Sequence, residues 1–102
     1  MISPQGEWIA DWYQLSGGGA AGWSADYVRV RRMTDNFSVS SDYVFSIISG
    51  DQLELRWTSE TELHIEYPDD GTPTRVESHW NSVSLSYSTF KRKERGVILR
   101  PQ

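Results

Sequence analysis

Apolar and polar residues alternate most regularly in two neighbouring stretches of the chain, residues 53–57 and 63–67. Every second residue in these stretches is apolar: Leu53, Leu55 and Trp57 in the first, and Leu63, Ile65 and Tyr67 in the second. Side chains along a β-strand point alternately to its two faces, so a period of two predicts strands with one buried and one solvated face. We therefore expect two half-buried strands.

A turn at residues 59–61 joins these strands into an antiparallel hairpin and determines their register. The apolar residues then face one another in three pairs: Trp57 with Leu63, Leu55 with Ile65, and Leu53 with Tyr67. On the opposite side we expect Arg56 across from His64 and diagonal to Glu62 and Glu66. This charge pattern is typical of the solvent-facing side of an antiparallel sheet.

Weaker strand patterns recur along the rest of the chain. They cover residues 8–14, 26–32, 43–49, 74–79 and 82–88, with a further short segment at 97–99. Turn-forming residues separate them, and residues 33–42 hold too many Ser, Asp, Asn and Thr residues for a helix. Short strands at intervals of about 8 to 12 residues predict an all-β fold. The expected architecture is a single antiparallel β-sandwich or open barrel of about seven to eight short strands.

The size of the chain limits it to one domain. It has 102 residues, of which 37% are apolar, and we expect a single β domain over residues 1–102. The absence of cysteine excludes disulfides, cysteine-ligated zinc, iron–sulfur clusters and thiol catalysis. The sequence shows no secretory signal peptide and no stretch of roughly 18 apolar residues, so we expect no membrane span.

Charge is distributed unevenly between the body of the chain and its last residues. Residues 1–90 hold 5 basic and 13 acidic residues, whereas residues 91–102 hold 5 basic residues and a single acidic one. We interpret the basic C-terminal segment, residues 91–102, as solvated and paired with the acidic body. The alternative is a basic tail that binds nucleic acid or anionic lipid. A body of this charge repels phosphate, so nucleic acid is not an expected partner.

Two sets of motifs resemble known proteins. Residues 3–10, Ser-Pro-Gln-Gly-Glu-Trp-Ile-Ala, resemble the Ser-Pro-Asp-Gly-x-x-x-Ala opening of WD40-like blades in periplasmic β-propellers. From residue 3 to about residue 87, the chain is similar to a family of small bacterial envelope proteins, many of them lipoproteins. That family carries Ser-Pro-Asp-Gly, a Cys-Gly-Ala-Thr loop, a Val-x-x-Arg strand end, and a Leu-x-Trp then Leu-x-Ile-x-Tyr hairpin. The opening corresponds to residues 3–6 here and the loop to residues 18–21. The strand end corresponds to residues 28–31, and the two parts of the hairpin to residues 55–57 and 63–67.

The resemblance implies a location in the periplasm or cell envelope but no known chemistry. Three departures bear on it: Gln5 replaces the acidic residue of the opening, Gly18 replaces the loop cysteine, and the lipid-attachment cysteine is absent. The last departure weakens the expected location, because that cysteine anchors the lipoproteins to the membrane.

Candidate catalytic and metal-ligating residues are few. His64 and His79 are the two histidines, and neither has a motif around it; His64, between Glu62 and Glu66, is expected in an exposed charge ladder. Asp69 and Asp70 lack the further ligands of a calcium loop, so we interpret them as turn residues. The serines have no nucleophile elbow, and the glycine run has no phosphate-binding sequel. We expect no enzyme activity, no cofactor and no metal.

Aromatic residues are the strongest functional signal, with five Trp and five Tyr residues in the chain. We place a partner-binding site at the glycine-rich loop and the strand before it, comprising Trp12, Tyr13, Gly18, Gly19 and Trp23. The alternative is that these rings cap the ends of a small sandwich. The expected function is a non-catalytic binding or accessory domain whose partner is a protein or a carbohydrate. The other candidate is a small inhibitor or immunity-type protein that binds a protein partner.

Overall fold

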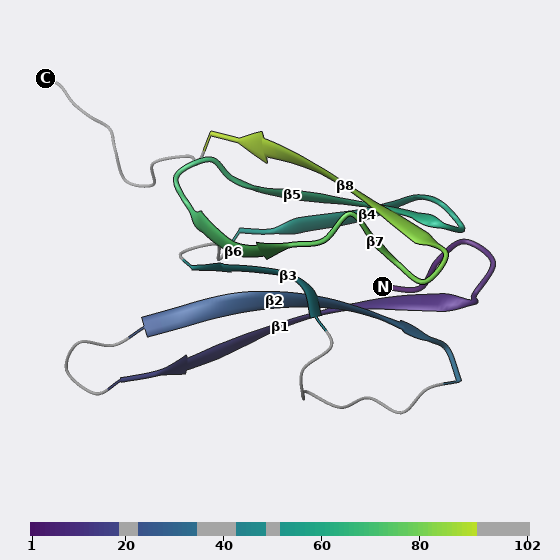
Figure 1. Ribbon diagram of the computed structural model, residues 1–102, viewed down its shortest axis with the longest axis horizontal. Helices are drawn as coiled ribbons and strands as arrows, with labels where there is room; N and C mark the ends of the chain where they lie inside the picture. Colours follow the sequence, from purple (N-terminus) through teal and green to yellow (C-terminus); the bar gives the residue numbers. More distant parts are fainter. Residues whose placement is uncertain (19–22, 35–42, 49–51, 92–102) are drawn as a thin grey trace, which may run out of the picture.

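The computed structural model of the chain describes residues 1–18, 23–34, 43–48 and 52–91, which form two four-stranded β-sheets packed face to face (Figure 1). The strands are β1 (Trp8–Gly17), β2 (Trp23–Arg32), β3 (Tyr43–Ile48), β4 (Glu54–Ser59), β5 (Glu62–Pro68), β6 (Thr72–Val76), β7 (His79–Trp80) and β8 (Val83–Phe90). The all-β sandwich is therefore confirmed: the described residues form eight strands, and their two sheets do not close into a barrel. The strand expected at residues 97–99 lies outside the described residues, as do residues 92–102 of the basic segment.

The strand order is β1-β2-β3-β6 in one sheet, called sheet A, and β4-β5-β8-β7 in the other, called sheet B. All strand pairs are antiparallel except β5 and β8, which run parallel. The sequence analysis did not predict this pair. It arises because the chain leaves sheet B after β5, adds β6 to sheet A, and returns to sheet B, as a parallel neighbour requires a crossover. The expected strand 74–79 is accordingly divided between β6 and β7.

The β4–β5 hairpin has the predicted register. Leu55 lies opposite Ile65, Trp57 opposite Leu63, and Arg56 opposite His64 on the other side. The β5 residues of these apolar pairs are fully buried, whereas Leu55 and Trp57 remain half-buried. The difference follows from position, because β5 lies inside sheet B and β4 lies at its edge.

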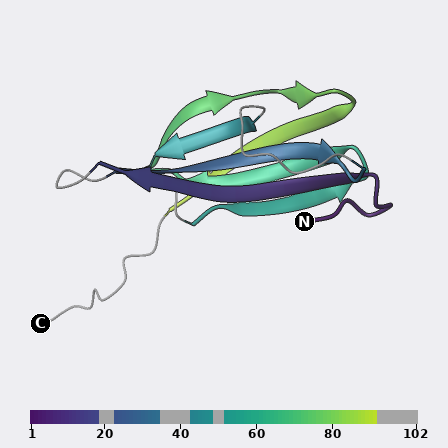
Figure 2. The ribbon, with the colours of Figure 1, turned by 90° about the horizontal axis from the view of Figure 1, so that it is seen from below.

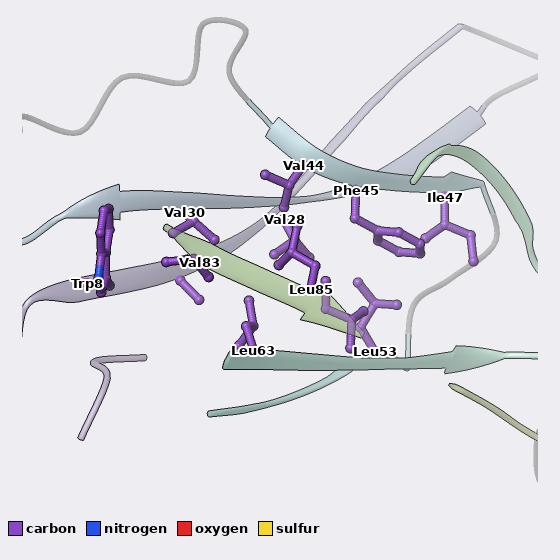
Figure 3. Close-up of a cluster of buried hydrophobic side chains, with 12 residues drawn as sticks. Trp8, Val28, Val30, Val44, Phe45, Ile47, Leu53, Leu63, Val83 and Leu85 are labelled. Carbon is purple, nitrogen blue, oxygen red and sulfur yellow. The ribbon is translucent and has the colours of Figure 1, made fainter. Parts of the chain in front are cut away.

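The hydrophobic core fills the space between the two sheets (Figure 3). Its buried members are Trp8, Ala10, Val28, Val30, Val44, Phe45, Ile47, Leu53, Leu63, Ile65, Val83 and Leu85. Phe45 contacts the rings of Tyr67 and Tyr87, with ring centroids 5.3 and 5.5 Å away, which joins sheet A to sheet B through aromatic contacts. Burying each large apolar side chain stabilises the fold by roughly 1.5–3 kcal/mol, so these inner faces supply most of the driving force for folding.

The N-terminal segment runs along the outer edge of β1. The backbone of Met1 exchanges hydrogen bonds with Ala10, at 2.8 and 2.9 Å, and Ser3 N–H donates to the Trp8 carbonyl. The Met1 carbonyl also accepts a hydrogen bond from the indole N–H of Trp57 in β4, at 3.1 Å. Residues 1–3 therefore connect the edge of sheet A to the edge of sheet B.

Glu60, in the β4–β5 turn, binds the turn that follows this segment. Its carboxylate accepts hydrogen bonds from the Ser3 hydroxyl and from the backbone N–H groups of Gln5 and Glu7. Partial desolvation raises the pKa of Glu60, but the three hydrogen bonds favour the charged form more strongly, and the net effect is a lowered pKa. The Ser-Pro-Gln-Gly motif is thus a turn held by a carboxylate from the other sheet, with Gly6 at a φ of 80°.

Asp69 and Asp70 lie in the turn between β5 and β6, as predicted. The turn closes through a 3.0 Å hydrogen bond from Gly71 N–H to the Pro68 carbonyl. A larger residue here would require the buried Ile47 side chain to shift, because a Cβ atom at residue 71 would lie 2.7 Å from its terminal methyl carbon.

Across the part of the chain that the structure describes, no helix has the length and apolar character needed to cross a membrane.

Candidate functional site

The predicted site residues Trp12 and Tyr13 lie on opposite faces of sheet A. The β1–β2 register is continuous from Trp8 opposite Arg32 to Gly17 opposite Trp23, so side chains along β1 alternate without interruption. Trp12 has the same parity as the buried Trp8 and points to the inner side, whereas Tyr13 points outward. The two rings therefore do not form one surface.

Trp12 is exposed but anchored. Its side chain is 44% exposed, and its indole N–H donates a 2.9 Å hydrogen bond to the carboxylate of Asp26. The Gln14 amide donates a second hydrogen bond to the other oxygen of this carboxylate, also at 2.9 Å. Asp26 is only 1% exposed, so the two donors satisfy a buried charged group. The ring of Trp12 is thereby held in one orientation while part of its surface stays accessible.

The glycine-rich loop is only partly described. Gly18 is exposed and has a φ of 99°, a left-handed conformation that favours glycine. Gly19 lies outside the described residues. The backbone of Trp23 begins β2, opposite Gly17, and its side chain is not described. The prediction that this loop and Trp23 bind a partner therefore stays a prediction.

Three tyrosines form a continuous ladder across the outer face of sheet A. Tyr13 of β1 stacks on Tyr27 of β2, with ring centroids 5.3 Å apart and planes 13° from parallel. Tyr27 in turn meets Tyr43 of β3 edge to face, at 4.9 Å and 75°. All three rings are half-buried, and burial raises the pKa of Tyr13, with Tyr27 and Tyr43 adding to the increase and Arg29 opposing it. The ladder is a packed aromatic surface on the outside of the sheet.

Arginines surround this ladder. The Arg75 guanidinium lies over the Tyr43 ring, 5.0 Å from its centroid, and forms an ion pair with Glu77 at 2.9 Å. Arg31 forms a 2.7 Å ion pair with Asp11 on the neighbouring strand. Arg29 lies opposite both Asp11 and Tyr43 in the register of β2 and is 6% exposed. These side chains place fixed hydrogen-bond donors around the aromatic rings.

Two exposed aliphatic side chains extend the same face toward the end of the β1–β2 hairpin. Leu15 is 43% and Ile48 45% exposed, and they lie on either side of the buried Ala25. We name the whole surface the tyrosine–arginine face; it comprises Tyr13, Tyr27, Tyr43, Arg29, Arg31, Arg75, Leu15 and Ile48. It spans β1, β2, β3 and β6, the strands of sheet A. Figure 2 shows two of them, β1 in purple and β2 in blue, running side by side.

Of the two predicted aromatic site residues whose side chains are described, Tyr13 belongs to this face and Trp12 does not. The stripe of Tyr27, Arg29 and Arg31 at every second position of one strand was the signal that could have revealed it.

The outer face of sheet B carries a hydrogen-bonded polar network instead. His64 contacts the hydroxyl of Ser86 through Nδ1, at 2.7 Å, and that of Ser88 through Nε2, at 2.8 Å. Ser88 donates its own proton to Glu66, at 3.1 Å. Because the Ser88 hydroxyl donates its proton to Glu66, it accepts a hydrogen bond from Nε2–H of His64. In the neutral imidazole, Nδ1 then accepts a hydrogen bond from the Ser86 hydroxyl. His64 thus lies on the solvated face as predicted, but serines of the parallel strand β8 contact its ring nitrogens.

This network resembles a nucleophile and base in one respect, the hydrogen bond between Ser86 and His64. In a Ser-His-Asp triad, the second ring nitrogen of the histidine is hydrogen-bonded to a carboxylate, whereas here the second nitrogen, Nε2, contacts the hydroxyl of Ser88. The adjacent depression, lined by Glu62, Ser84, Leu85 and Ser86, encloses about 140 Å³, less than the roughly 300–1,000 Å³ of a ligand pocket. His79 is exposed near its strand end and contacts Ser78. Among the described side chains, no group of three or more His, Asp or Glu residues is arranged to hold a metal ion.

Comparison with known proteins finds no matching family, no matching curated protein and no matching solved structure.

Proposed function

We propose that this chain is a non-catalytic module that binds a protein partner through the tyrosine–arginine face. The observation that carries the proposal is the gathering of tyrosine, arginine and exposed aliphatic side chains on one side of one sheet. Aromatic residues and arginine are enriched at protein interfaces and supply most of the residues whose truncation costs the most binding energy. The half-buried rings are already ordered, which lowers the entropic cost of binding.

The packing of the rings favours a protein over a carbohydrate or a nucleic acid. Sugars and bases stack on free ring faces. Here Tyr13 and Tyr27 cover one face of each other, and Tyr43 meets Tyr27 edge to face with Arg75 over its ring. Asp11 and Glu77, which pair with arginines on this side, also oppose a phosphate backbone.

The sequence left two candidates: a binding or accessory domain whose partner is a protein or a carbohydrate, and a small inhibitor that binds a protein. With a protein partner, the same face serves either. The envelope location implied by the resemblance is part of the proposal for the accessory domain. In that case the partner is another envelope protein.

A photo-crosslinking amino acid placed at Ile48 tests the proposal in the source cells. Ile48 is exposed on the proposed face and lies on β3, away from the β1 edge, and Ser84, exposed on sheet B, is the matched control position. We expect the probe at Ile48 to capture one protein species that the probe at Ser84 does not. Purified partner should then bind the Ile48→Glu variant at least about tenfold more weakly than the wild type, a loss of about 1.4 kcal/mol.

Equal binding of wild type and Ile48→Glu would contradict the proposed face. If Trp12→Ala and Trp23→Ala weaken binding instead, with unchanged thermal stability, the partner binds the hairpin end predicted from the sequence.

A further inference from the structure

β1 carries an open backbone edge toward the end of the β1–β2 hairpin. Residues of even number in β1 direct their N–H and C=O groups away from β2, as the hydrogen bonds from Met1 and Ser3 to Ala10 and Trp8 show. By the same alternation, Trp12, Gln14 and Ser16 present their backbone groups at this edge. No backbone group of the described residues pairs with them, since β2 is the only strand beside this part of β1.

The other sheet edges carry features that oppose pairing with a further strand. β4 places Glu54 and Arg56 at its edge, β6 contains Pro73 and Arg75, and β7 is two residues long. β8 extends past β7, but the Ser78 carbonyl accepts a hydrogen bond from the Leu85 N–H there, and the charged Lys91 follows the last residue of β8. From Trp12 to Gly17, β1 has neither a charged residue nor a proline. An edge of this kind is a template for an added strand.

We propose that the open edge of β1 pairs with the same edge of a second copy of this chain, in an antiparallel dimer centred on Gln14. In this register Gln14 lies opposite Gln14 of the second copy, and Trp12 lies opposite its Ser16. All outward N–H and C=O groups of the three residues then gain partners. On the outer face Tyr13 lies opposite Leu15 of the second copy, which covers an exposed aliphatic side chain.

Two structural features select this register. Met1 occupies the edge at Ala10, so a second copy cannot pair beyond residue 11 in that direction. In this register Gly18 of the second copy comes opposite Ala10, where Met1 is already bound. The strand ends at Gly17, and Gly18, with a φ of 99°, turns the chain away from Met1. The length left for pairing is residues 11–17, and its midpoint is Gln14.

The second copy is the occupant because the pairing segment matches itself. A twofold axis places identical surfaces together, so any net charge in the segment would repel its copy. Residues 12–18 carry none, and Asp11, at the margin of the pairing segment, is already paired with Arg31. The dimer forms one continuous eight-stranded sheet with two tyrosine–arginine faces on the same side. This goes beyond the proposed function and does not depend on it.

Sedimentation equilibrium of the full chain tests the dimer. Over about 10 µM to 1 mM, the range expected for pairing over one short edge, we expect the apparent mass to rise from 11.7 kDa toward twice that value. Ser16→Pro removes one outward N–H without touching the β1–β2 ladder, and Ser16→Lys adds a repelling charge. Both variants should stay at the monomer mass. Ser84→Lys, the same exchange at an exposed position of sheet B, should dimerise like the wild type.

Amide hydrogen exchange identifies the surface without any variant. Raising the concentration should slow exchange at Trp12, Gln14 and Ser16 at least about tenfold and leave Tyr13 and Leu15, which bond to β2, unchanged. A wild type that remains monomeric at 1 mM, a Ser16→Pro variant that dimerises normally, or a dimer without this alternating protection would each overturn the proposal. Partner binding by a monomeric chain would leave the proposed function intact.

Discussion

The outer faces of the two sheets differ in chemistry although both arise from strands with the same alternation of side chains. On sheet A, tyrosines contact one another and arginines pair with neighbouring acids. On sheet B, His64, two serines and Glu66 form a polar network beside other glutamates. Alternation therefore determines which side of a strand is buried, and the residues at the remaining positions determine whether the outer side is a polar network or a packed aromatic surface.

The two faces also differ in how the charged groups are used. Four of the five arginines in residues 1–90 lie on strands of sheet A, and their ion-pair partners lie on the same sheet or beside it. Sheet B carries Glu54, Glu62 and Glu66 with Arg56 as its one arginine. A chain with an acidic body thus presents its arginines together, which is a pattern that net charge alone conceals.

The largest effect should come from the inner side that both sheets share. Ile65→Ala removes a fully buried side chain and leaves a cavity between the sheets, which should cost about 2–5 kcal/mol in the free energy of unfolding. Urea unfolding followed by tryptophan fluorescence measures this loss. A loss below about 0.5 kcal/mol would show that the core does not rely on β5.

An intermediate effect should separate the two outer faces. Tyr27→Ala removes the middle ring of the ladder and both of its ring contacts, so we expect a loss of about 1–3 kcal/mol. His64→Ala removes two side-chain hydrogen bonds that solvent can replace, with an expected loss of about 1 kcal/mol or less. Parallel urea unfolding of the two variants makes the comparison. Equal losses would mean that the tyrosine ladder adds no more stability than the polar network.

The smallest effect on stability should come from the hydrogen bonds between the Glu60 carboxylate and the N-terminal turn. The pKa of Glu60 is lowered below 4.5 in the folded chain, so its charged form stabilises the fold above that pH. This stabilisation is lost as the pH falls from about 4.5 through the folded pKa. Glu60→Gln should lower the Tm at pH 7 and remove this part of the acid dependence. Thermal unfolding between pH 3 and pH 7 measures both, and parallel acid profiles for the two proteins would contradict the role of Glu60.

The β4–β5 hairpin was predictable in detail because two period-two patterns and a short turn between them agree on one register. Leu55 opposite Ile65 and Arg56 opposite His64 follow from that agreement alone. The parallel pairing of β5 with β8 was not predictable, because it depends on which sheet β6 joins, a choice made by packing between distant segments.

The tyrosine–arginine face was missed for a related reason. Tyr13, Tyr27 and Tyr43 come from three strands, and their contacts depend on registers across connections that the pattern of residues does not determine. The β1–β2 hairpin also continues to Gly17, past the predicted end at residue 14. Exposed polar and small residues near the loop concealed this extension. The aromatic content led to the predicted site, and of its residues the ladder includes Tyr13.

The N-terminal turn also constrains the order in which the chain folds. Its hydrogen bonds join residues 53 to 57 positions apart, from Ser3, Gln5 and Glu7 to Glu60 and from Trp57 to Met1. During synthesis these bonds cannot form until the β4–β5 hairpin has left the ribosome, so the N-terminal turn lacks its contacts with sheet B until then. Contacts between distant residues slow folding, because the intervening loop must close first. We therefore expect refolding in milliseconds to seconds, with the amino-terminal turn docking after the central hairpin has formed.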